Sequence, residues 1–508
     1  MTFDELLRTI DTDSLLQVFT YDAQQPLIFS SGLFLFLFLG FSFIYMLLRR
    51  HINTRLAFVT LFSYYFYYKS SGFYFFLLGV VTVSDWLIGR RIGQLRFPQS
   101  DKQPNDRAAK WLVALSVFID LALLGYFKYA NFFCGSIAAI FGNNFQPWDI
   151  FLPVGISFFT FQSLSYTIDV YRGEVKPLDR LLDYAFFVSF FPQLVAGPIV
   201  KARDFVPQIR QPLNITSRMF GQGVYLIIIG LFKKAVISDY ISINFVERIF
   251  EAPEMFSGVE VLLGLYGYSM QIYCDFSGYS DMAIGLALLL GYRFPMNFNA
   301  PYKSTSITDF WRRWHISLST WLKQYLYISL GGNRRGKVRQ YWNLFLTMLL
   351  GGLWHGASFN FVVWGALQGA ALCAHKWFSQ VILHRPRNYE SRGVMRFLAI
   401  LVTFHFITAG WILFRASDSS VSVTLLSKLF TDFHGELLFD VLAGYPWVFG
   451  LMAFGFVTHY LPDRWQSRIV ARLSMTNVVV QALLITAVIY LVIQVKSSDI
   501  QPFIYFQF

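Results

Sequence analysis

One histidine stands where an imidazole could act on a bound molecule inside a membrane. His355 lies within residues 343–372, a stretch without a charged side chain, and glycines flank it in the sequence LLGGLWHGA. Ionisable groups at membrane depth are costly and usually line a cavity, and adjacent glycines permit a kink or a close helix approach. We therefore expect a functional role for His355. A buried histidine can also do no more than hydrogen-bond a neighbouring helix, and His405, in the apolar run 397–414, fits that structural role.

A second histidine, His315, lies in a segment that breaks the apolar pattern. Residues 301–339 contain eight basic residues and one acid, with Trp and Tyr residues between them. We expect an amphipathic interfacial helix that starts with Thr308 or Asp309 as N-cap and ends at Gly331-Gly332-Asn333. A cytoplasmic loop with an aromatic belt explains this composition. An electropositive mouth for a phosphorylated ligand, such as coenzyme A or an acidic carrier protein, explains it equally well, and His315 favours this second interpretation.

Further polar residues interrupt apolar runs. Asp275 and Asp281 have no Lys or Arg near them in the sequence, so we expect remote partners or a water-filled border. Two carboxylates without a third ligand are weak evidence for a metal, and we predict none. Pro192 and Gly197-Pro198 predict a broken helix end at the interface. Motifs for nucleotide hydrolysis and zinc proteolysis are missing from the sequence.

The elements that position these residues are predicted to be membrane helices. The 508 residues are 55% hydrophobic and 14% charged, against about 25% charged in typical soluble domains. The composition predicts an all-α, polytopic transmembrane bundle with about 11 spans plus interfacial or re-entrant helices. The net charge of +12 suits cytoplasmic loops and anionic lipid headgroups rather than nucleic acid, and three cysteines do not indicate a disulfide framework.

The apolar windows divide the chain into three parts. We expect an interfacial lead-in over 1–26, a transmembrane catalytic domain over 27–495 and an aromatic tail over 496–508. Basic residues place the loop 90–110 in the cytoplasm. The predicted helical windows are 27–48, 56–68, 72–89, 111–133, 151–170, 184–199, 219–239, 258–292, 343–372, 397–414, 446–462 and 477–495, of which the long ones could hold two helices.

Several of these segments carry a family resemblance. The sequences DFSGYSDMAIG, NFNAPYKSTSITDFWRRWHISLSTWLKQYLYISLGGNRRG and LLGGLWHGASFNFVVWGALQG resemble the membrane-bound O-acyltransferase (MBOAT) family. Within that family they are similar to the bacterial branch that O-acetylates alginate and other polysaccharides. The resemblance implies that His355 is the catalytic histidine and His315 the second motif histidine. The polar residues of these motifs are Asp275, Asp281, Asp309 and Asn333.

The resemblance also suggests a donor site and a carrier. Donor phosphates would meet a basic region that contains Arg312, Arg313, Lys323, Arg334 and Arg335. The ending FIYFQF resembles the aromatic tails of related acetylation proteins, and by that analogy Tyr505 would carry the acyl group. Composition alone favours an interfacial anchor for this tail.

The function implied is transfer of acetyl from cytoplasmic acetyl-CoA across the bacterial inner membrane to an exported polysaccharide. No bound cofactor is expected. The expected partners are membrane lipids, acetyl-CoA, and an extracytoplasmic SGNH-type acetyltransferase or polysaccharide-export proteins. Two alternatives remain: D-alanyl transfer from a carrier protein to a cell-envelope polymer, and a transporter or flippase. Paired broken helices in inverted repeats would favour transport, but the segment around His355 has no second copy in the sequence.

Overall fold

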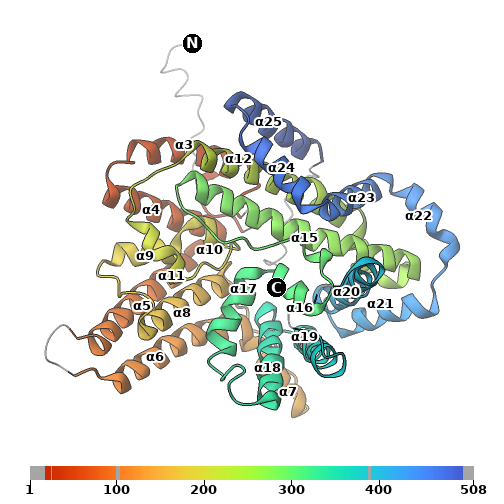
Figure 1. Ribbon diagram of the computed structural model, residues 1–508, viewed down its shortest axis with the longest axis horizontal. Coiled ribbons are helices and arrows are strands. Elements are labelled where there is room, and N and C mark those ends of the chain that lie inside the picture. Colours follow the sequence, from red (N-terminus) through yellow and green to blue (C-terminus); the bar gives the residue numbers. More distant parts are fainter. Residues whose placement is uncertain (1–17, 24–25, 99–102, 387–388, 390, 496–508) are drawn as a thin grey trace. The chain divides into compact units, whose positions relative to one another are not determined.

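The structure is a computed structural model that describes residues 18–23, 26–98, 103–386, 389 and 391–495. Every regular element in these ranges is a helix, which confirms the predicted all-α class (Figure 1). The predicted lead-in falls mostly outside the described residues, and the tail with Tyr505 falls wholly outside them. Contacts divide the chain into two compact units: residues 1–127, 150–195 and 201–213 form one, and the rest forms the other.

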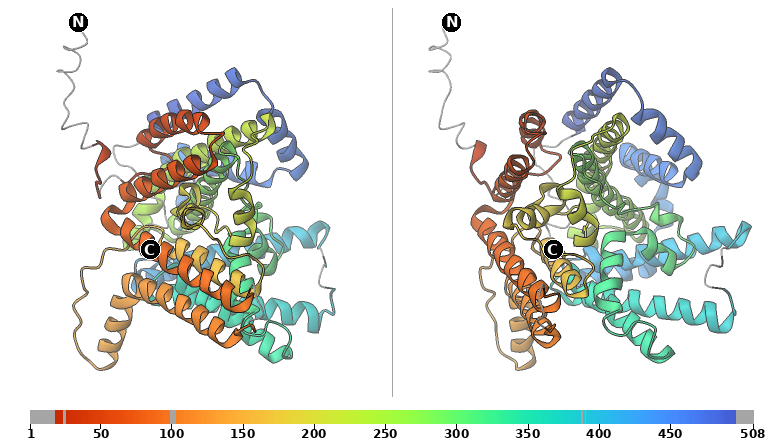
Figure 2. Two further views of the ribbon diagram at one scale, coloured as in Figure 1. Left: turned by 90° about the vertical axis from the view of Figure 1, so that its left-hand side faces the viewer. Right: turned by 60° about the vertical axis from the view of Figure 1, so that its left-hand side comes forward.

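In the first unit, α5, α6 and α8 pack on one another and α4 packs on α9 (Figure 2). The Asp85 carboxylate of α5 accepts hydrogen bonds from Ser116 of α6, at 2.7 Å, and from Ser163 of α8. The helices of this unit are α3 (Gly32–Leu47), α4 (Ile52–Ser71), η1 (Gly72–Tyr74), α5 (Phe75–Arg96), α6 (Asp106–Leu124), α8 (Ile156–Arg172), α9 (Leu181–Ser189), α10 (Phe191–Leu194) and α11 (Ala202–Ile209). The interruptions between α9, α10 and α11 confirm the break predicted around Pro192 and Gly197-Pro198.

The second unit holds the candidate site. The π-helical turn η2 (Gly125–Tyr129) leads into its first helix, α7 (Ala130–Ile140). The middle of the unit contains α12 (Ser217–Leu231), η3 (Phe232–Ser238), α13 (Asp239–Ile241), η4 (Ser242–Val246), α14 (Glu247–Glu251), η5 (Pro253–Met255), α15 (Gly258–Leu289), η6 (Pro301–Lys303), α16 (Ile307–Arg313), α17 (Ile316–Trp321) and η7 (Leu322–Tyr327). The remainder contains α18 (Lys337–His355), α19 (Phe359–Trp377), η8 (Phe378–Ile382), α20 (Gly393–Arg415), α21 (Ser419–Thr431), η9 (Gly435–Leu437), α22 (Leu438–Gly444), α23 (Pro446–Tyr460), α24 (Asp463–Ser474) and α25 (Val478–Val495).

Glycines let α12 lie directly against α15, the long green helix in Figure 1. A Cβ added to Gly230 would lie 2.5 Å from the carbonyl oxygen of Gly278, and one added to Gly223 would lie 2.9 Å from that of Gly285. The pairing order shows that the two helices are antiparallel. Small residues at such crossings allow backbones to approach closely, which strengthens dispersion contacts in a lipid environment. The 258–292 window thus forms one helix rather than two.

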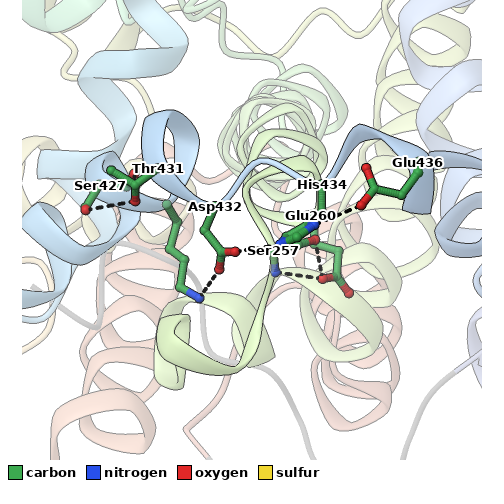
Figure 3. A network of polar contacts seen from close by, with 8 residues as sticks. Ser257, Glu260, Ser427, Thr431, Asp432, His434 and Glu436 are labelled. Carbon is green, nitrogen blue, oxygen red and sulfur yellow. Dashed lines mark hydrogen bonds and ion pairs between the residues drawn. The ribbon is translucent and has the colours of Figure 1, made fainter.

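The start of α15 is fixed by a polar network (Figure 3). Ser257 and Glu260 form a capping box, in which the backbone N–H of Ser257 donates to the Glu260 carboxylate at 2.8 Å. The first two helical N–H groups donate to carbonyls of the loop after α21, at 2.7 and 2.8 Å. In that loop, His434 lies 2.8 Å from both Asp432 and Glu436. The loop therefore supplies acceptors that the helix end lacks.

Only some of the described helices could cross a bilayer by their own length and hydropathy. Three stretches qualify, Ile52–Arg96, Asp106–Ile140 and Gly393–Arg415. Two bent pairs would qualify together: η9–α22 with α23, at 97°, and α24 with α25, at 111°. Each predicted window contains a helix, and 343–372 contains two, α18 and α19, which are separated at Gly356–Ser358. The total of about 11 spans stays a prediction.

Candidate active site

The segment around His315 is broken rather than one continuous helix, so the prediction for it was wrong. Ser306, and neither Thr308 nor Asp309, caps α16: its side-chain oxygen accepts from the N–H of Asp309 at 3.2 Å. The Asp309 carboxylate instead accepts from the N–H of Thr305 (3.3 Å) and from Nε of Arg313 (3.0 Å). The Ser306 hydroxyl thus supplies an acceptor to one of the N–H groups that the start of a helix leaves without an intrahelical partner.

His315 occupies the break between α16 and α17. Its backbone is left-handed, with φ 44° and ψ 55°, a conformation that residues other than glycine seldom adopt. Two backbone hydrogen bonds hold the break against the chain that follows α15. The N–H of Ile316 donates to the carbonyl of Asn297, and that of Asn299 donates to Arg313, both at 2.9 Å. Tertiary pairing therefore imposes the local conformation that ends the helix.

Asn297, which the sequence analysis did not single out, orients the imidazole of His315. Its Oδ1 accepts from the N–H of Ser317 (3.2 Å) and the Ser317 hydroxyl (2.9 Å), while its Nδ2 donates to Ser280 of α15 (3.0 Å). A backbone N–H can only donate, so the atom facing it is the amide oxygen. That oxygen lies 3.2 Å from Nδ1 of His315, and Nδ1 must therefore carry the hydrogen.

The electrostatics of His315 follow from this geometry. Complete burial lowers its pKa to about 3, so the ring is neutral at physiological pH. In a neutral imidazole with hydrogen on Nδ1, Nε2 is the nitrogen that can accept a proton or a hydrogen bond. The only sequence signal for Asn297 was its place in NFNAPYKS, directly after a long apolar helix.

His355 ends α18 inside an aromatic enclosure. Its ring centroid lies 5.0 Å from Trp354, 5.3 Å from Trp364 of α19 and 5.1 Å from Phe414 of α20. The ring of Trp354 is also 6.2 Å from that of His315. The structure thus brings both predicted histidines to one buried centre. Such apolar surroundings disfavour the imidazolium form and keep a ring available as a base.

Close packing of α18 on α19 places His355. A Cβ at Gly352 would lie 2.5 Å from the carbonyl oxygen of Phe361 and 2.6 Å from the Cα of Gly365. At Gly356 a Cβ would overlap the ring of Phe361, at 2.0 Å. The expectation that the glycines around His355 permit a close helix approach is confirmed.

Beside this centre lies a large electropositive cavity. It has a volume of about 1030 Å³, and its described lining residues lie in η6, α16, α17, η7, α18, α19, η8 and α20 and in the connecting segments, which include Arg385, Pro386, Tyr389 and Ser391. Asp309 is the single acidic side chain among its described lining residues. The basic ones are Lys303, Arg312, Arg313, Lys323, Lys376, Arg385 and Arg396. The fields of Arg312 and Arg385 add to burial in lowering the pKa of His375, which accompanies them in the wall.

The cavity includes three of the five predicted donor-binding residues: Arg312, Arg313 and Lys323. Arg334 and Arg335 are exposed and are not among its described lining residues. Their role, like that of the exposed Asn333, stays a prediction. The other four basic residues of the wall, Lys303, Lys376, Arg385 and Arg396, were not predicted as donor-binding residues. The run from Lys376 to Arg396, basic and directly after an apolar window, was the signal for three of them.

The cavity approaches the histidines without being lined by either. Ile316, which follows His315, lies in its wall, and so does Met348, seven residues before His355 in α18. Seven residues correspond to roughly 10 Å along a helix. A ligand held by its charged end in the cavity could reach the buried centre with an extended arm.

Asp275 and Asp281 of α15 form ion pairs with residues distant in the sequence, which was one of the two alternatives expected for them. Nζ of Lys233 lies 2.7 Å from Asp281, and Nζ of Lys234 lies 2.6 Å from Asp275 and 2.8 Å from Asp239. Both lysines belong to η3. These ion pairs tie η3 to α15, and none of their members lines the cavity described above.

His405 has the structural role expected of it. Its Nδ1 donates to the carbonyl of Leu401 in the same helix, at 2.8 Å, so Nε2 accepts from the Tyr266 hydroxyl of α15, also at 2.8 Å. The predicted acyl carrier, Tyr505, lies outside the described residues.

Taken together, the second unit defines a helical membrane protein with a buried two-histidine centre beside an electropositive cavity. The family model "MBOAT, membrane-bound O-acyltransferase family" matches residues 178–414, which contain both histidines and the whole cavity wall. Similarity to individual relatives extends over about four fifths of the chain. The chain belongs to the membrane-bound O-acyltransferase family and is an O-acyltransferase.

Three relatives illustrate the range of the similarity. A probable alginate O-acetylase of Pseudomonas aeruginosa is 43% identical over 80% of this chain and 75% of its own length. A peptidoglycan O-acetyltransferase of Helicobacter pylori is 38% identical over 82% of this chain and 81% of its own length. A teichoic acid D-alanyltransferase of Bacillus subtilis is 30% identical over 53% of this chain and 70% of its own length.

Proposed function

We propose that this protein takes acetyl from acetyl-CoA at the cytoplasmic face of the bacterial inner membrane and passes it toward hydroxyl groups of an exported polysaccharide. The observation that carries the proposal is the cavity, in which seven basic side chains face one acid beside the two-histidine centre. Acetyl-CoA presents a pyrophosphate and a ribose phosphate at one end and its thioester at the end of a long arm. Arginine and lysine are the usual ligands of such phosphates.

The chemistry assigned to the centre is acyl transfer from a thioester to a hydroxyl. The hydroxyl oxygen attacks the thioester carbonyl, a C–O bond forms and the C–S bond breaks. His355 accepts the hydroxyl proton and returns it to the departing thiolate, so that coenzyme A leaves as the thiol. A positioned general base of this kind contributes about 10²- to 10⁴-fold in rate. His315, on the cavity side of the centre, orients the donor.

The acceptor side of the proposal rests on the relatives. Two of the three named above are described as O-acetylating enzymes of alginate and peptidoglycan, both of which are polymers that carry sugar hydroxyls. We propose an extracytoplasmic SGNH-type acetyltransferase as the partner that receives the group, and Tyr505 as the residue that carries it outward.

D-alanyl transfer is the second candidate, which the Bacillus subtilis relative supports. The two donors would place different groups against the basic wall of the cavity. Acetyl-CoA would fill the cavity with phosphates, whereas a carrier protein would present an acidic surface. Competition by free coenzyme A therefore separates them.

The deciding experiment is acetyl-CoA turnover by the purified full chain in nanodiscs. We expect His355→Ala to lose at least about 100-fold in rate, and His405→Ala, which removes a histidine with a structural role, to keep most of it. Acetyl label on the wild-type protein that disappears in Tyr505→Phe would support the carrier step. Turnover that persists in His355→Ala, or a rate that depends only on a D-alanyl carrier protein, would contradict the proposal.

A further inference from the structure

Two neighbouring side chains far from His355 in sequence reach the end of α18. Nζ of Lys128 lies 2.9 Å from the carbonyl oxygen of Trp354 and 2.9 Å from that of His355. The hydroxyl of Tyr129 donates to the carbonyl of Leu353 at 2.8 Å. Lys128 and Tyr129 end the π-helical turn η2, directly before α7.

These contacts supply what the end of a helix lacks. The last four carbonyls of an α-helix have no intrahelical donor, and in α18 the last three of them belong to Leu353, Trp354 and His355. The chain leaves the helix in an extended conformation at Gly356, with φ −164° and ψ 154°. It therefore does not use the left-handed glycine that commonly closes a helix. Side chains from another segment bind the carbonyls instead.

We infer that Lys128 and Tyr129 form a clamp that fixes the position of His355, with Lys128 as the main positioning residue. A cation at a helix C-terminus is favoured by the helix dipole, and its hydrogen bonds to carbonyls are charge-assisted. Lys128 binds the carbonyl of the histidine itself, and its ammonium also lies 6.0 Å from the ring centroid of Trp354. The clamp thus holds both the histidine and the neighbouring aromatic ring that faces His315.

The clamp differs from a general packing contact because it acts on one turn. Lys128 is half-buried and Tyr129 is buried, and their acceptors are the three final carbonyls of one helix. Loss of the ammonium would remove its hydrogen bonds to the carbonyls of Trp354 and His355 and loosen the last turn of the helix. A displacement of about 1 Å at a reacting group can cost roughly 100-fold in rate.

The first test measures the turn directly and needs no acyl donor. Hydrogen–deuterium exchange of the full chain in nanodiscs is compared for wild type, Lys128→Met and Tyr129→Phe. We expect faster exchange in the peptide that covers residues 350–356, more in Lys128→Met than in Tyr129→Phe. Lys110→Met is the matched control, because this lysine lies in the same apolar stretch but is 65% exposed and pairs with Asp106. Unchanged exchange at 350–356 in Lys128→Met would overturn the clamp.

The second test connects the clamp to catalysis and rests on the proposed function. In acetyl-CoA turnover we expect Lys128→Met to lower kcat about 10- to 100-fold with KM for acetyl-CoA within about twofold. Lys128→Arg, which keeps a cationic donor, should recover part of that loss. Faster exchange with an unchanged kcat, or an equal loss in Lys128→Arg, would overturn the positioning role. Absence of wild-type turnover would instead refute the proposed donor, while the exchange result still decides the clamp. If Lys128→Met does not fold, Tyr129→Phe decides both tests.

Discussion

The cavity beside the histidine centre makes a prediction about charge that one set of matched substitutions can test. Arg312, Lys323 and Arg334 all lie in the basic segment, and replacing any of them with glutamine removes one positive charge. Arg312 and Lys323 line the cavity, whereas Arg334 is not among its described lining residues. The first two substitutions should therefore weaken the binding of a donor held in the cavity, and the third should hardly change it.

The size of the effect follows from the exposure of these side chains. A hydrogen bond to a charged group contributes about 1.5 to 3 kcal/mol when water is excluded. Arg312 and Lys323 are exposed in the structure, so solvent screening reduces the value to about 1 kcal/mol each. We expect the dissociation constant of coenzyme A to rise roughly fivefold for each single substitution and about 25-fold for both, if the two sites are independent.

Calorimetric titration of coenzyme A into the protein in nanodiscs would measure these constants, with KM for acetyl-CoA as the kinetic counterpart. Repeating the titration at about 0.5 M salt should shrink the differences, since screening shortens the range of surface charges. An Arg334→Gln variant that weakens binding as much as Arg312→Gln would refute the cavity as the donor site and favour a diffuse basic surface. Binding unchanged in all three variants would refute a phosphate contact in this segment.

Three further predictions concern stability. In Asn297→Leu, Nδ1 of His315 and the N–H and hydroxyl of Ser317 lose the amide oxygen that accepts from them. The free energy of unfolding, measured by thermal unfolding in detergent, should therefore fall by about 3 kcal/mol. A loss under about 1 kcal/mol would contradict the assigned network. Gly352→Ala places a Cβ 2.5 Å from a carbonyl oxygen of α19 and should cost about 1 to 3 kcal/mol, whereas Gly40→Ala, with open space around it, should not destabilise the protein. Contact with Glu436 and Asp432 raises the pKa of His434. Its imidazolium therefore stabilises the loop below the usual histidine pKa, and that stability is lost as pH rises through the raised value. The melting temperature of wild type should exceed that of His434→Gln at pH 6, and the gap should close by about pH 9; a gap independent of pH would contradict the ionic contact.

The helices were predictable because apolar runs of membrane length are strong local signals. His355 was predictable for a related reason, since an ionisable residue inside such a run is rare, whereas His315 was predicted from its place in a basic, Trp-rich segment. The break at His315 was not predictable, because a chain distant from α16 imposes it. Residues 301–330 have the composition of an amphipathic helix, and backbone hydrogen bonds to residues 297–299 hold the chain on both sides of His315 in its broken conformation.

The partners of the histidines were hidden for the same physical reason. Asn297 lies 18 residues before His315, and Lys128 lies 227 residues before His355. Nothing in the sequence pairs such distant positions. The positive charge of the cavity was predicted from the basic segment. The full set of its lining residues was not, because the wall also includes the end of α19 and residues before and at the start of α20.

The contact between Lys128 and the end of α18 also has a consequence in time. Lys128 is made first, in an apolar stretch long enough to cross the membrane, and its acceptor in His355 follows 227 residues later. At a synthesis rate of about 5 to 20 residues per second, roughly 10 to 45 s pass between the synthesis of Lys128 and that of His355. A lone lysine in the centre of a span costs about 2.5 to 3.5 kcal/mol. The growing chain therefore contains Lys128 long before the carbonyls of Trp354 and His355 that accept its hydrogen bonds, and a chain that stops earlier lacks both acceptors.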